Sequence, residues 1–502
     1  YSLYHTNHAC FKIIFVVITM IFSVPFSAQN HLFEQMRKSM NEYSLPLVNL
    51  IIDTSKVNRN SYINGKIEIA DCSYLKNDSS KVIRYFCKYR YRGASAATYE
   101  KKSFAIKLLD EKGKDFDANI FGIREENSWI LDAMAIDRTR MRNRICFDVW
   151  NDLNHTPYKT IYGNRNGTEG TFVEVFINGD YHGLYCMTDK IDRKLLGLKK
   201  ARLSENGNVQ TKGLLYKGIS WGNNTDIHLL SYNEADTNRD TWNSWELQYP
   251  DEYPSVDTWQ PLMNLIEFCS DKTTNEQFAK GYEEYFFTDN LTDYVVFTLG
   301  LGIGDNAYKN TFLSLVDITI AHRFLITPWD MDMSLGGHWN GKYNEILADV
   351  NRYNEIAPFN RLIVNNIAGF RDKLKDKWKA HHTTLFSMEG ISKRLDNYAN
   401  MFLLSGAWER EYNKWNENPV TLKESILDEL DYIKTWYQKN YDNLCRQFGV
   451  QPVNAIVNTT LSTTPHSLNG VYTLDGRKID KNQLHEMKTG VYIVNGRKVI
   501  AR

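Results

Sequence analysis

The residues best suited to chemistry lie in the stretch 304–337, GDNAYKNTFLSLVDITIAHRFLITPWDMDMSLGG. Asp305 lies five residues before Asn310, and Asp330 and Asp332 stand near the end of the stretch. Hard divalent cations prefer carboxylate and amide oxygens as ligands, and such cations neutralise the charge that develops on oxygens in phosphoryl transfer. The residue types and their spacing therefore indicate a metal-dependent site that acts on phosphate groups.

The elements between these residues are readable from the pattern of side chains. Residues 311–316 and 323–327 are β-branched and aromatic, which predicts two strands with Asp317 in the polar break between them. An Asp-x4-Asn loop, a hairpin and a later Asp follow each other in a protein-kinase active site. There the first Asp accepts the proton of the substrate hydroxyl, while the Asn and the later Asp hold Mg²⁺. The alternative is structural, because Asp and Asn also serve as turn residues and helix caps.

Length and composition limit the classes of function. The chain has 502 residues, enough for two or three domains, with 60 Lys+Arg against 60 Asp+Glu. A formal charge of zero gives no global reason to expect nucleic acid or an anionic membrane as a partner. Thirty Tyr and 12 Trp argue against disorder and for aromatic packing with polar tips.

The first 28 residues are expected to be a signal peptide. An apolar run, 13–26, ends at Ser27 and Ala28 before the polar Gln29, and it is too short to span a bilayer. The alternative is an uncleaved N-terminal anchor. No later stretch is long and apolar enough for a membrane helix, so we expect no stable membrane span. The predicted location is extracellular or at the cell surface, with the periplasm as a second compartment.

Six cysteines follow the expected signal peptide, and none forms a CxxC pair, which argues against a zinc site. An exported protein can form disulfides, but these cysteines lie in apolar strand or helix contexts. Buried free thiols are therefore expected at Cys72, Cys87, Cys146, Cys186, Cys269 and Cys445.

The first half of the chain is predicted to be mostly β. Strands are expected at 47–52, 61–69, 82–90 and 103–108, and a helix capped by Asp137 at 138–152. A hairpin turns at Asn178-Gly179, between 172–177 and 181–187. Glu174 alternates with Val173 and Val175, so it is expected on a solvated sheet face. No period is evident in the polar, Trp-rich insertion 219–260.

The second half is predicted to be helical. Helices are expected at 262–269, 275–287 and 291–299, and several more within 358–448, including 422–447. Together these elements predict an α+β, two-lobed fold with a nucleotide cleft between the lobes. No GxGxxG or Walker loop is present, so neither a Rossmann site nor a P-loop is supported.

The C-terminal end reads as a separate part. Residues 451–467 form a Ser/Thr/Asn/Pro linker, and 468–502 a small all-β module. The module repeats the pattern GVY-[TI]-x-[DN]-G-R-K, which predicts two hairpins with type I′ turns at Asp475-Gly476 and Asn495-Gly496.

Several separated motifs together resemble the spore-coat protein H (CotH) kinase family, over about residues 45–445. They include Arg92-Gly93, Lys101-Lys102-Ser103, Trp129-Ile130-Leu131 with Asp137 and Arg142-Asn143, Val173-Glu174-Val175 through Gly183-Leu184-Tyr185, and the Asp305/Asn310 and Trp329-Asp330-Met331-Asp332 segments. The order and spacing of these motifs carry the resemblance rather than any one of them.

The resemblance implies an atypical protein-kinase-like fold over 29–450 that transfers the γ-phosphate of ATP to Ser/Thr of proteins, with Mg²⁺ or Mn²⁺. Carried over, Asp305 is the catalytic Asp, and Asn310 with Asp330 or Asp332 binds the metal. Lys102 is the expected phosphate-binding lysine, with Lys107 as the alternative and Arg92-Gly93 beside the phosphates. Asp189 stands where family members often have a Glu, one methylene longer, that pairs with this lysine.

The C-terminal module resembles the sorting domain of proteins exported by the Bacteroidota type IX secretion system, whose machinery is then an expected partner. Three functions follow from the sequence. The first is an exported protein kinase acting on exported, Ser/Thr-rich proteins. The second is a non-catalytic surface or coat protein that keeps the fold as a binding module. The third is another nucleotide-dependent transferase. Metal-dependent nucleotide binding distinguishes the first from the second.

Overall fold

The structure, a computed structural model, describes residues 31–72, 82–203, 206, 209–219, 239–242, 245–307, 309–453, 471–473, 478–479, 490–494 and 497–501. The predicted signal peptide, most of the predicted linker and both predicted C-terminal turns lie outside the described residues. The chain divides into two compact units, Tyr1–Pro452 and Val453–Arg502.

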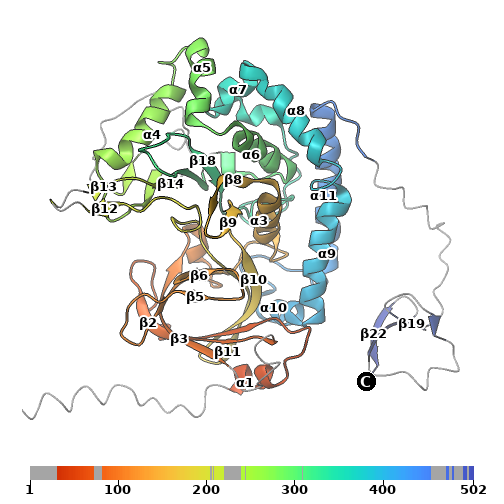
Figure 1. Cartoon of the computed structure of the whole chain (residues 1–502). Helices are drawn as coiled ribbons and strands as arrows, with labels where there is room; N and C mark the ends of the chain where they lie inside the picture. Colours follow the sequence, from red (N-terminus) through yellow and green to blue (C-terminus); the bar gives the residue numbers. More distant parts are fainter. Residues whose placement is uncertain are drawn as a thin grey trace, which may run out of the picture. The chain divides into compact units, whose positions relative to one another are not determined.

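A closed seven-stranded barrel is the main β element of the first unit, and it lies at the lower end of that unit in Figure 1. Its inner face is apolar, since alternate residues such as Phe104, Ile106 and Leu108 point inward and are buried. Around the barrel the strands run in the order β1 (Leu47–Ile51), β10 (Gly170–Ile177), β11 (Asp180–Thr188), β7 (Ser128–Asp132), β4 (Ser103–Leu109), β3 (Ile83–Arg92) and β2 (Ile63–Ala70).

Six of these strands agree with the predicted ones to within a few residues, and the seventh, β7, was not predicted as a strand. The barrel closes through a parallel pair, in which Leu47 of β1 lies opposite Glu174 of β10. The β10–β11 hairpin turns at Asn178 and Gly179, whose φ values are +52° and +90°, as a type I′ turn requires.

The prediction for Glu174 is wrong. Its side chain is 1% exposed and pairs with the Arg410 guanidinium at 2.7 and 2.8 Å. Helix α10 (Ala407–Trp415), which comes from the other end of the chain, covers this part of the barrel. Sheet alternation cannot reveal a helix that packs on the outer face.

Helix α3 (Arg142–Leu153) begins four residues later than predicted. The preceding turn is held by Asp137, which is buried and accepts hydrogen bonds from the amides of Thr139, Met141 and Arg142. Burial acts to raise the pKa of Asp137, but Arg142 and these amides hold it below its usual range. Asp137 thus caps the helix from outside it rather than from the adjoining position.

A second sheet of five strands follows in the order β15 (Thr241–Trp242), β16 (Trp245–Tyr249), β14 (Leu214–Gly218), β17 (Thr311–Leu315) and β18 (Leu325–Pro328). The β17–β18 hairpin is the predicted one. Strands β15 and β16 lie in the insertion that showed no period. Short strand pairs complete the β structure of this unit: β5 (Ala118–Asn119) with β6 (Glu125–Glu126), β8 (His155–Thr160) with β9 (Gly163–Arg165), and β12 (Arg202–Leu203) with β13 (Val209–Gln210).

Helices make up most of the rest of this unit, and α4 to α8 lie at its upper end in Figure 1. They share one large apolar core with α3 and the second sheet, in which Trp150, Trp259, Trp378 and Trp436 are fully buried or nearly so. The α-helices are α1 (His31–Lys38), α4 (Val256–Cys269), α5 (Asn275–Tyr285), α6 (Thr288–Gly300), α7 (Phe359–Val364), α8 (Phe370–His381), α9 (Met388–Leu404) and α11 (Ile426–Gln447). The 3-10 helices are η1 (Ser95–Thr98), η2 (Asp305–Ala307), η3 (Val350–Glu355) and η4 (Ile367–Gly369).

The mixture of helices and strands confirms the predicted α+β class. Within the described ranges no helix is long and apolar enough to cross a membrane. The six cysteines within the described ranges form no disulfide with one another, and all but the half-buried Cys72 are buried, as predicted. In the second unit the strands β20 (Lys478–Ile479), β19 (Val471–Thr473), β21 (Gly490–Val494) and β22 (Arg497–Ala501) pair in that order.

Candidate active site

The loop after α6 brings Asp305 and Asn310 together. Asp305 opens η2 and is 8% exposed. One of its carboxylate oxygens, Oδ2, accepts a hydrogen bond from the Asn310 amide at 3.3 Å and pairs with the Lys309 ammonium at 2.9 Å. Asn310 has a φ of +57°, a conformation that Asn tolerates better than most residues. The Asp-x4-Asn spacing therefore produces a direct contact between the two side chains.

Asn306, which the sequence analysis passed over, ties this loop to the second acidic segment. Its side-chain amide donates to the backbone carbonyls of Asn310, at 2.8 Å, and Trp329, at 2.9 Å. Asn306 is 2% exposed, so these bonds are shielded from water. The bonds fix the Asp305 loop against the residue that directly precedes Asp330. In the sequence, only its position next to Asp305 could have pointed to a role for Asn306.

Asp330 and Asp332 flank Met331, and the barrel reaches the site at this point. The Met331 amide donates to Oδ1 of Asn143, at 3.1 Å, and the Asn143 amide donates to Asp132 at 3.0 Å. Asn143 lies on α3 and Asp132 ends β7. Asn143 therefore positions a barrel carboxylate beside the acidic segment. Asp132 was not predicted, although it directly follows the noted Trp129-Ile130-Leu131.

Acidic neighbours disfavour the ionised forms of Asp330 and Asp332. Burial, Asp330, Asp132 and Asp305 raise the pKa of Asp332 well above its usual range. Burial and Asp132 also raise the pKa of Asp330, while Lys217 and Arg92 act against the rise. Solvent reaches Asp330, whereas Asp332 is half-buried, so burial is the firmer cause for Asp332. Four carboxylates from three parts of the chain thus share one region of negative potential.

A divalent cation fits this donor set. The oxygens of Asp330, Asp332, Asp305 and Asn310 are hard donors of the kind that Mg²⁺ and Mn²⁺ prefer, and a cation would relieve the repulsion among the carboxylates. Within the part of the chain that the structure describes, no three carboxylate, His or Cys groups are already close enough to hold one. A metal site here would therefore need the amide oxygen of Asn310 as a further ligand, together with Asp330, the carboxylate that solvent reaches.

Arg92 lies at the same site. It is the last residue of β3, and its guanidinium carbon lies 5.3 Å from the centre of the Trp329 ring. Burial lowers the pKa of Arg92, and the carboxylates of Asp132 and Asp330 counteract that effect. Arg92 thus lies beside the acidic segment, and its contact with phosphates stays a prediction.

Lys102 and Asp189 are not brought together. The Lys102 ammonium donates to the backbone carbonyls of Ala97, at 2.9 Å, and Tyr99, at 2.6 Å, so it fixes the η1 turn. The alternative, Lys107, lies within β4 with its ammonium 5.7 Å from the Tyr62 ring. Among the described residues, neither lysine forms an ion pair with an acidic residue of the site.

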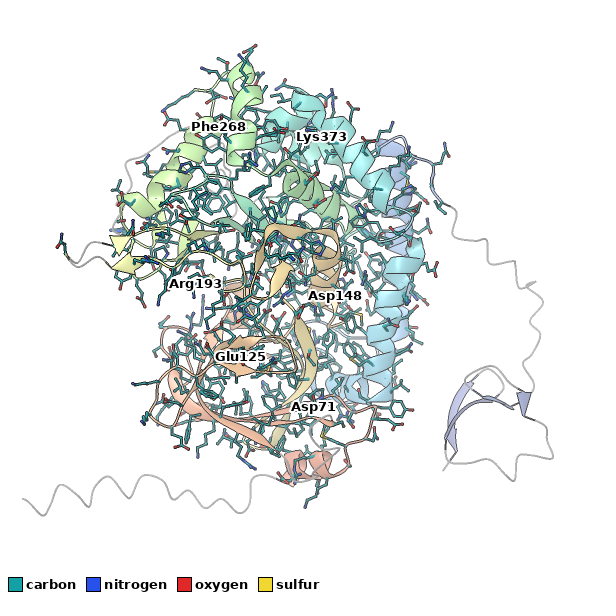
Figure 2. The ribbon with its side chains drawn as sticks, in the orientation of Figure 1. Asp71, Glu125, Asp148, Arg193, Phe268 and Lys373 are labelled. Atoms are coloured by element: carbon teal, nitrogen blue, oxygen red, sulfur yellow. The ribbon has the colours of Figure 1, made fainter. Side chains whose placement is uncertain are left out.

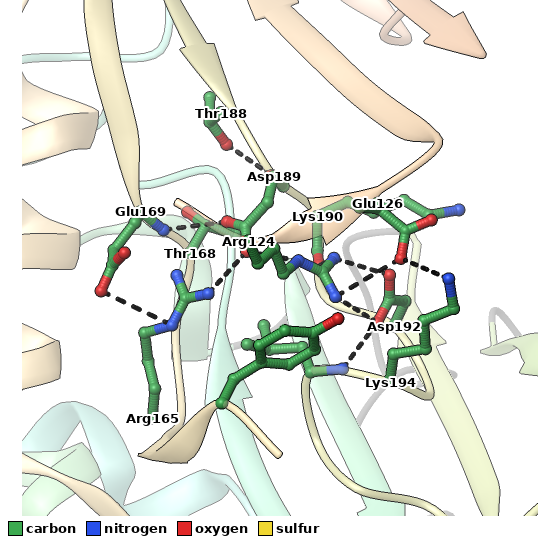
Figure 3. A network of polar contacts seen from close by, with 12 residues as sticks. Arg124, Glu126, Arg165, Thr168, Glu169, Thr188, Asp189, Lys190, Asp192 and Lys194 are labelled. Carbon is green, nitrogen blue, oxygen red and sulfur yellow. Dashed lines mark hydrogen bonds and ion pairs between the residues drawn. The ribbon is translucent and has the colours of Figure 1, made fainter. Parts of the chain in front are cut away.

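Asp189 belongs to a separate buried network (Figure 3). Its carboxylate pairs with Arg124 at 2.9 Å and Arg165 at 2.8 Å, and accepts a hydrogen bond from the Glu169 amide at 2.9 Å. Arg124 also pairs with Asp192, at 2.7 Å. Burial raises the pKa of Asp189, although both arginines oppose the rise. These contacts tie the end of β11 to the segments around β6 and β9.

Lys101, by contrast, is fully buried. Its ammonium pairs with Glu411 of α10 and donates to the Leu184 carbonyl at 2.7 Å. Glu411 also accepts from Arg140 at 2.7 Å and from the Leu184 amide at 2.7 Å. Burial lowers the pKa of Lys101 to about 7, with Glu411 opposing the change. No pattern in the sequence pointed to this pair.

A cavity of about 790 Å³ lies elsewhere in this unit, among α5, α6 and α8. Asn154, Asp293, Arg323 and Lys377 are among its lining residues, and none of the predicted site residues lines it. Lys373, another lining residue, lies at the far end of the unit from Asp71 near the barrel (Figure 2). The carboxylates and Arg92, rather than this cavity, form the candidate active site.

A comparison with protein families identifies the family of this chain. A family model described as CotH kinase protein matches residues 89–444, which is most of the chain. The chain belongs to the CotH kinase family. The matched range includes Arg92, Asp132, Asn143, Asp305, Asn310, Asp330 and Asp332. No curated protein matches the chain.

Proposed function

We propose that this protein is an atypical protein kinase that transfers the γ-phosphate of ATP to Ser or Thr of a protein. The observation that carries the proposal is the assembly of Asp305, Asn310, Asp330 and Asp332 into one region of negative potential by direct contacts and bridging amides. Membership of the family supports the same activity.

In this proposal each group has a distinct role. Asp305 accepts the proton of the acceptor hydroxyl and orients it. Asn310 and Asp330 or Asp332 hold Mg²⁺ or Mn²⁺, which supplies neutralisation of charge on the phosphate oxygens. Asn306 and Asn143 position these groups without touching the nucleotide. A protein that only binds a partner would not need Asp330 and Asp332, whose ionised forms are disfavoured by their acidic neighbours, and this argues against the non-catalytic alternative.

The experiment compares the base with the metal ligands. Asp305→Asn should leave nucleotide binding nearly intact and cut transfer by about 10²–10⁴-fold, the usual loss of a general base. Asp330→Ala or Asp332→Ala, whichever residue is the inner ligand, should weaken metal-nucleotide binding. Transfer is measured with radiolabelled ATP on exported Ser/Thr-rich proteins and as autophosphorylation. A wild-type protein that binds no nucleotide at any metal concentration would refute the proposal.

We also propose that the protein is exported, acts on exported Ser/Thr-rich proteins, and is sorted through its C-terminal strands. The support is the apolar run 13–26 with its small residues, together with the C-terminal resemblance. N-terminal sequencing of the exported protein should give a start near Gln29. Recovery of residues 1–20 in the mature form would contradict cleavage.

A further inference from the structure

Another lysine, which no motif singled out, lies near the candidate site on the second sheet. Lys217 lies in β14, where it is opposite Glu246 of β16 and Phe312 of β17. Its ammonium lies 5.9 Å from the centre of the Phe312 ring, and the side chain is half-buried. The backbone of Lys217 is fixed by pairing with strands on both sides, so its side chain extends from a defined point of the second sheet.

Lys217 and Arg92 approach the same carboxylate from different elements. Arg92 ends a barrel strand and lies against the Trp329 ring, while Lys217 lies in the second sheet against the Phe312 ring. The centres of these two rings are 5.9 Å apart, and the charge of each cation interacts with Asp330. Burial and the nearby Arg92 lower the pKa of Lys217, while Asp330 and Glu246 oppose the change. Like charges that are partly desolvated and close together are costly unless an anion joins them.

The described residues do not supply that anion at contact distance. Among them, no carboxylate lies within 4.0 Å of the Lys217 ammonium or the Arg92 guanidinium, although Asp305 pairs with Lys309 nearby at 2.9 Å. Glu246 is directly opposite Lys217 in the strand register but forms no such pair with it. The two cations are thus available to an incoming ligand, whereas most buried cations of this unit already have partners.

The charge pattern identifies the class of ligand. Carboxylates suited to a divalent cation lie beside two cations suited to phosphate oxygens, and a polyphosphate chain satisfies both when it brings the metal with it. Arg provides a fork of donors and Lys a point charge, so together they can bind neighbouring phosphate groups.

We propose that Lys217 and Arg92 together bind the phosphate groups of the nucleotide, and that Lys217, not Lys102, is the lysine that contacts them. This inference rests on the proposed function, because it names the phosphate contacts of the same site. Lys102 is held by the Ala97 and Tyr99 carbonyls, and Lys101 is buried against Glu411. Neither is free to turn toward Asp330.

The test measures the affinities of ATP, ADP and adenosine for the full-length protein with Mn²⁺ present. Lys217→Met keeps most of the apolar stem and removes the charge, and Lys102→Met is the matched control. Lys217→Met should weaken ATP binding by about 10–100-fold, the usual scale for a charge-assisted contact, and leave adenosine binding unchanged. Lys217→Arg should restore most of the ATP affinity, and Lys102→Met should leave it within about twofold. Thermal melting of each variant checks that the sheet is intact.

Three results overturn the inference. If the wild type binds ATP but Lys217→Met binds it equally well, Lys217 does not contact phosphate, and the proposed kinase function stands. The conclusion is the same if Lys102→Met loses more ATP affinity than Lys217→Met does. If the wild type binds no nucleotide, the proposed function fails. The inference is then tested by measuring the binding of tripolyphosphate, without metal, to the wild type and to Lys217→Met. Binding that is lost in Lys217→Met supports a phosphate site, and no binding overturns it.

Discussion

At the scale of single residues, the acidic cluster is costly to the folded protein. Asp332 is half-buried near Asp330, Asp132 and Asp305, and its pKa is raised well above the usual range. Between the unfolded and the raised folded pKa, the folded state binds more protons than the unfolded state. The free energy of unfolding therefore falls as pH rises through this window. The protein keeps a group that weakens its metal-free form, as expected of a functional site.

The first prediction concerns this cost. Asp332→Asn removes the charge and keeps the shape, so in the absence of metal it should raise the Tm at pH 8 by a few degrees. The rise should shrink as pH falls, because the wild-type carboxyl then takes up its proton. Scanning calorimetry from pH 5 to pH 8, with a chelator present, measures this. A lower Tm for Asp332→Asn at pH 8 would show that the charge stabilises the fold.

In the matched control, Asp317→Asn, the Tm should change in the opposite direction. Asp317 accepts hydrogen bonds from the amide and hydroxyl of Thr319, at 3.0 and 2.6 Å. Burial acts to raise the pKa of Asp317, but these bonds lower it overall. Its ionised form therefore stabilises the fold above the unfolded pKa and loses that effect as pH falls. Asp317→Asn should lower the Tm at pH 8.

The sequence predicted the part of the site whose residues lie close together along the chain. Asp305 and Asn310 meet because they share one loop, and Asp330 and Asp332 follow a hairpin that was readable from its β-branched residues. Asp132 and Lys217 were missed because only tertiary packing brings their elements to the loop. Lys101 and Lys102 look equivalent in sequence, and only the packing of α10 and η1 distinguishes them.

At the scale of elements, the barrel was predictable strand by strand but not as a barrel. Alternation and the Asn178-Gly179 turn give the strands and one hairpin. Closure depends on the parallel pairing of β1 with β10, which no local pattern encodes. The short strand β7 reads as a continuous apolar run because both its faces are covered, so it shows no alternation.

The second prediction belongs to α10, which fastens the late helices to the barrel. Glu411 is fully buried and is shared by Lys101, Arg140 and the Leu184 amide. Glu411→Ala leaves two buried cations without their carboxylate and should lower the free energy of unfolding by about 3 kcal/mol. Release of a proton from Lys101, whose pKa is about 7, would moderate the loss at high pH.

Urea unfolding at pH 7 measures this loss, with Glu409→Ala as the control. Glu409 lies on the same helix and is exposed, so its removal should change the free energy of unfolding by less than about 0.5 kcal/mol. Equal losses for the two variants would mean that the Glu411 contacts add nothing specific, and that α10 is held by Trp408 and its apolar neighbours alone.

At the scale of the whole molecule, the first unit brings its site together from the ends of two sheets. Arg92 and Asp132 end barrel strands, and Lys217 and Asp330 belong to the second sheet or directly follow it. The loop that carries Asp305 follows α6, and α11 packs against α6 and α9 (Figure 1). These elements all precede Val453, where the second unit begins.

The last prediction follows from this division. In the second unit the described strands β19 to β22 pair with one another, and the elements of the candidate site all lie in the first. A chain that ends at Val453 should therefore stay soluble, keep its Tm within about 2 °C, and keep its nucleotide affinity within about twofold, because no described core contact is removed. Calorimetry and nucleotide titration of the truncated and full-length chains measure this. A truncated chain that aggregates, or that melts several degrees lower, would mean that residues after Val453 complete the fold of the first unit.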